Sequence, residues 1–183
     1  MLADTLATVA AAPAARRVVF WTEPPGDLDP APGQFESHVQ SETDLSARLT
    51  AAASMLMRQG HRVILVGCDC PGLTVPLLVQ AIEALQRGDS VVGASADGSY
   101  WLLGLSREAP ELFTGIDWES GRVLQQTLTR AASEGLSVTM LPLLADLDTP
   151  QDLALLVGHV AAGDPHVCGP RLVTTLRQLS LLP

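Results

Sequence analysis

The segment that most restricts the fold is 63–69. Its β-forming run, Val63–Val66, is followed after two small residues by a single carboxylate, Asp69. An apolar run without charge is typical of a strand buried on both faces of a parallel sheet. Pro71 and Gly72 follow, and a helical pattern begins directly after them. Open α/β sheets bind their ligands at the carboxyl ends of the strands. Asp69 is therefore the first candidate site residue.

Strand and helix patterns alternate along the rest of the chain. Helical spacing of apolar residues covers 2–12, 44–60, 74–88, 120–134, 149–160 and 170–181, and β-forming runs cover 17–22, 90–94, 100–105 and 137–143. Residues 23–36 contain four prolines and two glycines and are predicted to form a loop. The alternation predicts a three-layer α/β/α fold with a mostly parallel sheet. At this length, residues 1–183 are expected to form a single domain.

Composition excludes several classes of function. The formal net charge is −9, with 20 acidic and 11 basic residues and no basic cluster, which argues against nucleic acids or anionic membranes as partners. No apolar run is long enough to span a bilayer, and the first residues lack the basic region of a signal peptide. Three cysteines do not make a disulfide framework. We therefore predict a cytoplasmic location.

Two aspartates, Asp69 and Asp148, share one sequence context, because each follows a predicted strand and precedes a predicted helix. If both strands end at the same edge of the sheet, the two carboxylates can converge on Mg²⁺ or Mn²⁺, which prefer oxygen ligands. The alternative is that Asp148 completes the turn before Thr149 and that Asp69 caps a bend before Pro71. Spacing alone favours this turn-forming alternative.

Three ordered segments resemble one family of transferases. They are residues 67–73 (GCDCPGL), 97–105 (DGSYWLLGL) and 146–153 (DLDTPQDL). They are similar to the segments G-T-D-C-P-x-L, D-G-G-Y-Y-L-I-G-L and D-x-D-T-P-E-D-L of the uncharacterised selenodomain-associated transferase family. That family has a glycosyltransferase-A fold and is similar to molybdenum cofactor guanylyltransferase and 2-phospholactate guanylyltransferase. Residues 44–48 (DLSAR) also match a family segment, D-L-G-x-R.

The resemblance implies a nucleotide-diphospho-sugar-transferase fold and a metal-dependent nucleotidyltransferase or glycosyltransferase. Its substrates would be a nucleoside triphosphate or nucleotide sugar and a small acceptor. Asp69 and Asp148 would be the catalytic and metal-binding residues, with Mg²⁺ or Mn²⁺ as the cofactor. The residues implied for substrate binding are Asp97, Gly98, Tyr100 and Arg48.

The sequence departs from the family pattern at its start. Family members begin with a strand and a glycine-rich basic loop that binds the nucleotide phosphates, and no counterpart is found here. We therefore expect the first strand of the fold to be missing, which would leave an exposed sheet edge. Two further hypotheses follow. The chain is a non-catalytic binding or assembly module, with a second copy covering that edge as a homodimer, or the true start lies upstream of Met1.

Overall fold

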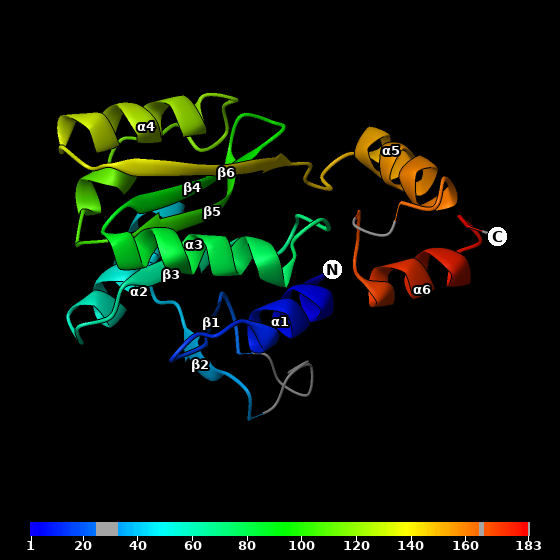
Figure 1. Ribbon diagram of the computed structural model, residues 1–183, viewed down its shortest axis with the longest axis horizontal. Coiled ribbons are helices and arrows are strands. Elements are labelled where there is room, and N and C mark those ends of the chain that lie inside the picture. The colour runs from blue at the N-terminus through cyan, green and yellow to red at the C-terminus, as the bar shows by residue number, and fades with distance from the viewer. Residues whose placement is uncertain (25–32, 165–166, 183) are drawn as a thin grey trace.

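The computed structural model describes residues 1–24, 33–164 and 167–182. Its central sheet has four strands in the order β3 (Val63–Val66), β5 (Tyr100–Leu105), β4 (Ser90–Ser95) and β6 (Val138–Leu144) (Figure 1). β5 is antiparallel to β3 and to β4, whereas β4 is parallel to β6. Three of the four strands thus run in one direction, and only β5 is reversed. The carboxyl ends of β3, β4 and β6 consequently lie at the same edge of the sheet.

Helices cover both faces of this sheet, which confirms the predicted three-layer α/β/α fold (Figure 1). The elements are α1 (Leu2–Ala11) and α3 (Val75–Arg87) on one face, and α2 (Leu45–Met57), η2 (Pro110–Phe113) and α4 (Val123–Ser133) on the other. Neighbouring residues of β4 show the two faces, because Val91 packs with the α3 residues Ala81 and Leu85, whereas Val92 packs with Phe113. This alternation follows from the two-residue period of a strand.

Two short parallel strands, β1 (Val18–Trp21) and β2 (Glu36–Val39), form a second sheet. The sequence predicted β1 but not β2. Three of the four residues of β2 are polar, and all of them are exposed except the partly buried His38. The rest of the predicted 23–36 loop lies largely in 25–32, outside the described residues. Within the described part of the chain, β3 pairs only with β5, and β1 pairs only with β2.

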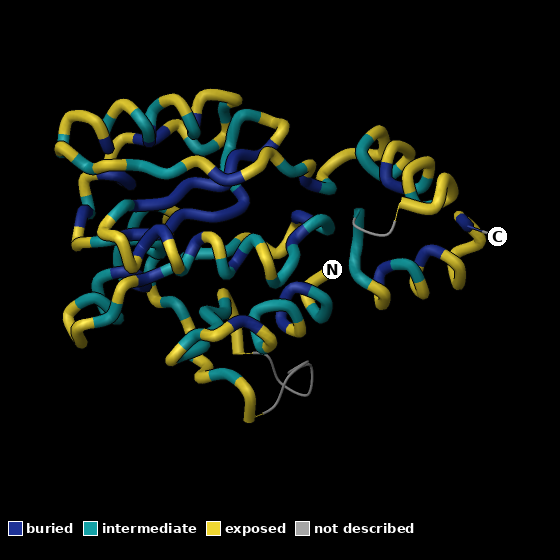
Figure 2. Tube along the Cα trace, in the orientation of Figure 1, coloured by how far each residue is buried: buried dark blue, intermediate teal, exposed yellow. Residues whose placement is uncertain are grey.

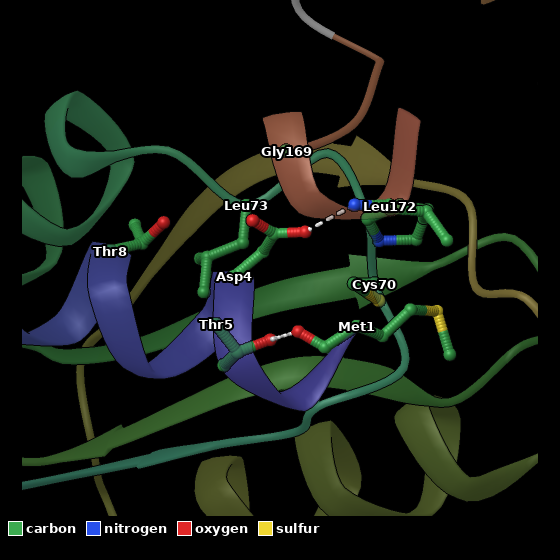
Figure 3. Close-up of a pocket in the computed structure, with 9 residues that line it drawn as sticks. Met1, Asp4, Thr5, Thr8, Cys70, Leu73, Gly169 and Leu172 are labelled. Atoms are coloured by element: carbon green, nitrogen blue, oxygen red, sulfur yellow. Dashed lines mark hydrogen bonds between the residues drawn. The ribbon is translucent and has the colours of Figure 1, made fainter. Parts of the chain in front are cut away.

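The last two helices, α5 (Pro150–Ala161) and α6 (Pro170–Gln178), pack on each other around their own apolar cluster. α6 is joined to α1 by Asp4, whose carboxylate accepts the backbone N–H of Leu172 at 2.8 Å (Figure 3). The same carboxylate accepts the backbone N–H of Arg171 at 3.2 Å. Asp4 therefore caps the start of α6 from a distant part of the sequence. None of the described helices has the length and apolar character required to cross a membrane.

Candidate functional site

Backbone hydrogen bonds join three loops at the carboxyl edge of the central sheet. The N–H of Leu147, in the loop after β6, donates to the carbonyl of Asp69, after β3, at 3.0 Å. The N–H of Ala96, in the turn between β4 and β5, donates to the carbonyl of Leu144 at 3.0 Å. The loops that follow β3, β4 and β6 are therefore fixed relative to one another by main-chain atoms.

Carboxylate side chains from these loops lie close together. Asp97, Asp146 and Asp148 each offer an oxygen atom, and these three oxygens lie within 4.8 Å of one another. Asp69 lies near enough that its charge helps to raise the pKa of Asp148. Four aspartates from the ends of three strands thus share one small region.

A tight turn holds Asp97 in place. Its Oδ1 accepts the backbone N–H of Ser99 at 2.8 Å, and Gly98 follows it with a φ of +91°. The turn rests against the segment before α4, because a Cβ atom on Gly98 would lie only 2.2 Å from the carbonyl oxygen of Gly121. Leu124 also donates its N–H to the carbonyl of Gly98 at 2.9 Å. Only glycine combines this conformation with so close a backbone contact.

A capping box fixes the chain next to Asp148. Thr149 accepts the N–H of Asp152 at 3.2 Å, and the Asp152 carboxylate accepts the N–H of Thr149 at 2.7 Å and that of Asp148 at 3.2 Å. The hydrogen bonds from Thr149 lower the pKa of Asp152. Asp152 is thus committed to the start of α5, as the sequence predicted.

The crowded carboxylates disfavour one another's charge. Burial, the charge of Asp97 and a hydrogen bond to it, and then the charge of Asp148 raise the pKa of Asp146 to about 6. Burial, followed by the charges of Asp69 and Asp97, raises the pKa of Asp148. A bound cation would offset this repulsion, and the all-oxygen donor set fits Mg²⁺ or Mn²⁺.

The structure changes the predicted site in two respects. Asp97, for which the family resemblance implies a role in substrate binding, lies together with Asp146 and Asp148, and its role toward a substrate stays a prediction. Asp146 was not predicted at all, although the Asp-x-Asp spacing of Asp146 and Asp148 directly after a strand could have indicated it. Asp148 is part of the cluster and Asp69 borders it, and the metal-binding roles of both residues stay predictions.

Two predicted substrate-binding residues make their contacts elsewhere. The ring of Tyr100 packs edge-on against Trp118, with 6.3 Å between ring centroids, and burial of its hydroxyl raises its pKa. The Nε of Arg48 donates to the carbonyl of Glu42 at 2.9 Å, just before α2. These contacts tie Tyr100 to the core beneath α4 and Arg48 to the start of α2. Their roles toward a substrate stay predictions.

Comparison with known proteins supports this description of the fold. Residues 5–120 match the family described as "Uncharacterized protein conserved in bacteria (DUF2064)". The chain also superimposes on the crystal structure of a "putative nucleotide-diphospho-sugar transferase" from Desulfovibrio desulfuricans G20, with a TM-score of 0.82 and 28% sequence identity. The match covers 96% of this chain and 80% of that one. No curated protein matches the sequence.

Proposed function

The chain belongs to the DUF2064 family and has a nucleotide-diphospho-sugar transferase fold, and we propose that it is a transferase dependent on Mg²⁺ or Mn²⁺. Its donor would be a nucleoside triphosphate or a nucleotide sugar, and its acceptor a small molecule with a phosphate or hydroxyl group. The observation that carries this proposal is the convergence of Asp97, Asp146 and Asp148 at the carboxyl edge of the sheet.

In this proposal Asp97, Asp146 and Asp148 hold the cation, and Asp69 lies beside them. When bound, the ion would neutralise the charge that develops on the phosphate oxygens of a leaving group. The protein residues contribute fixed positions, because the turn at Gly98 and the capping box at Thr149 orient the carboxylates before a ligand arrives.

The charge of the site predicts that the cation binds before the nucleotide. Four carboxylates in one region repel the anionic phosphates of a nucleotide unless a cation is present. A nucleotide or nucleotide sugar should therefore stabilise the protein only together with the metal.

A thermal-shift matrix tests this expectation. A panel of nucleoside triphosphates and nucleotide sugars is measured with and without Mn²⁺, on the wild type and on Asp148→Asn. We expect Mn²⁺ alone to raise the unfolding temperature of the wild type, one class of nucleotide to raise it further, and both effects to be lost in Asp148→Asn. Absence of any metal-dependent stabilisation in the wild type would contradict the proposal.

One observation favours a second candidate, a non-catalytic binding module. In the described chain, β1 and β3 belong to separate sheets, so each has an edge without a strand partner. We propose, as the alternative, that a second copy of the chain covers such an edge in a homodimer. Light scattering at several concentrations tests this, because a strictly monomeric species would refute the dimer. Partner binding that survives Asp69→Ala would favour the module over the enzyme.

A further inference from the structure

Gly67 lies between the last residue of β3 and Asp69, and its backbone continues the sheet. Its N–H donates to the carbonyl of Trp101, on β5, at 2.9 Å. A Cβ atom on Gly67 would lie 2.8 Å from Oδ1 of Asp69 and 3.7 Å from the carbonyl oxygen of Trp101. The Asp69 carboxylate therefore folds back over Gly67 and occupies the space that a side chain would take.

The backbone itself gives no reason for a glycine at this position. Gly67 is not among the described glycines with a positive φ, so its conformation is open to other residues. The contact that excludes a side chain is with the mobile end of Asp69 and not with the main chain. Gly98 differs on both counts, since its φ is positive and a Cβ atom there would meet the backbone of Gly121.

The backbone of Asp69 is fixed independently of its side chain. Its carbonyl accepts the N–H of Leu147, which lies between Asp146 and Asp148. The peptide of Asp69 therefore stays beside the carboxylate cluster, and only the direction of its carboxylate is left to the side-chain rotamer. Steric access at Gly67 is what permits the rotamer seen in the structure.

We propose that Gly67 is a positioning residue, whose missing side chain allows the Asp69 carboxylate to fold back at the edge of the candidate metal centre. The proposal rests on the proposed function in one respect, namely that a cation binds at the Asp97, Asp146 and Asp148 cluster, and it adds Asp69 as a residue that supports this binding from the side. The geometric part does not depend on a metal, because a methyl group at Gly67 would force the Asp69 carboxylate to rotate away. The fold then survives while the site changes.

The first experiment reads the geometry without any metal. The χ1 and χ2 angles of Asp69, which together define its rotamer, are determined from metal-free crystal structures of the wild type, of Gly67→Ala and of Gly158→Ala. Gly158 is the matched control, because a Cβ atom on that helix glycine meets nothing within 4 Å. We expect a new Asp69 rotamer in Gly67→Ala only. An unchanged rotamer in Gly67→Ala would overturn the proposal whatever the metal does.

The second experiment reads the consequence for binding. The Mn²⁺ affinity is measured by water-proton relaxation for the wild type, Gly67→Ala, Asp69→Ala and the double variant. We expect Gly67→Ala to weaken binding about tenfold, at the lower end of what the loss of a supporting residue costs a metal site. In the Asp69→Ala background, Gly67→Ala should have no further effect. An equal loss in both backgrounds would show that Gly67 does not act through Asp69.

The two experiments separate the possible failures. If the wild type does not bind Mn²⁺ while the rotamer changes as expected, the proposed function fails and the geometric role of Gly67 stands. If the wild type binds Mn²⁺ and the Gly67→Ala affinity is unchanged, the inference about Gly67 fails and the proposed function stands.

Discussion

The four-stranded sheet and the β1–β2 pair bury their residues to different extents. All six residues of β4 and five of the six of β5 are buried, whereas no residue of β1 or β2 is (Figure 2). Helices cover the larger sheet on both faces, so the side chains of its two central strands, β4 and β5, pack against helices on either side. The candidate site stands on the buried sheet. Its carboxylates are therefore positioned by a core that tolerates little movement.

The sharpest test of this comparison is Trp101→Ala. Trp101 is 1% exposed, its Nε1 donates to the carbonyl of Pro142 at 3.3 Å, and its ring fills the space beside Gly93. Removal of a buried aromatic side chain costs about 3–5 kcal/mol. Urea unfolding of Trp101→Ala should show a loss in this range. Trp21→Ala in β1, where the indole is partly exposed, is the control and should cost much less. Equal losses would break the comparison.

The next effect is expected at Gly98→Ala, in the turn that holds Asp97. The variant forces alanine to a φ of +91° and places its Cβ against the backbone of Gly121. We expect a loss of about 2–3 kcal/mol, since strained backbone costs about 1–3 kcal/mol per residue. Gly60→Ala isolates the conformational part, because Gly60 has a φ of +85° and nothing within 4 Å of its Cβ position. Gly98→Ala should therefore lower the free energy of unfolding more than Gly60→Ala does.

The pH dependence of stability should have opposite signs in the two regions. The pKa of Asp146 is raised to about 6 by burial, so the metal-free protein should lose stability as pH rises from about 4 to 6. Asp146→Asn should remove this loss and gain on the order of 1 kcal/mol at pH 7.5. The hydrogen bond from Arg16 lowers the pKa of Glu36 in β2. The stability that ionised Glu36 contributes is therefore lost as pH falls below the ordinary pKa of a glutamate. Urea unfolding of the metal-free wild type and of Asp146→Asn between pH 3 and pH 8 checks both signs.

The smallest effect is expected at Arg16→Ala. Arg16 Nε donates to Glu36 at 2.8 Å, and this pair joins the start of β1 to β2. Exposed ion pairs contribute little because water and salt screen them. Thermal unfolding should therefore change only slightly, and less in 0.5 M salt than in low salt. A large loss for Arg16→Ala would show that the β1–β2 pair carries more of the stability than its exposure indicates.

Local features of the site were predictable from the sequence. The strand that ends before Asp69 and the Thr149–Asp152 capping box were both predicted, and both are present. Strand β2 was missed, because a Glu-Ser-His-Val segment lacks the apolar alternation by which strands are recognised. β2 is a strand because its backbone pairs with that of β1, and this pairing leaves no pattern in its side chains.

The grouping of the candidate metal ligands required the tertiary structure. By itself the sequence determined the alternation of elements, the strand-end carboxylates and the helix caps, because such features depend on residues within a few positions of one another. The grouping of Asp97 with Asp146 and Asp148 depends on the strand order β3-β5-β4-β6, which brings residues about 50 positions apart together. The direction of the Asp69 carboxylate over Gly67 is decided by packing at atomic distances. Sequence periodicity carries no information about either, because both arise from contacts between separate elements.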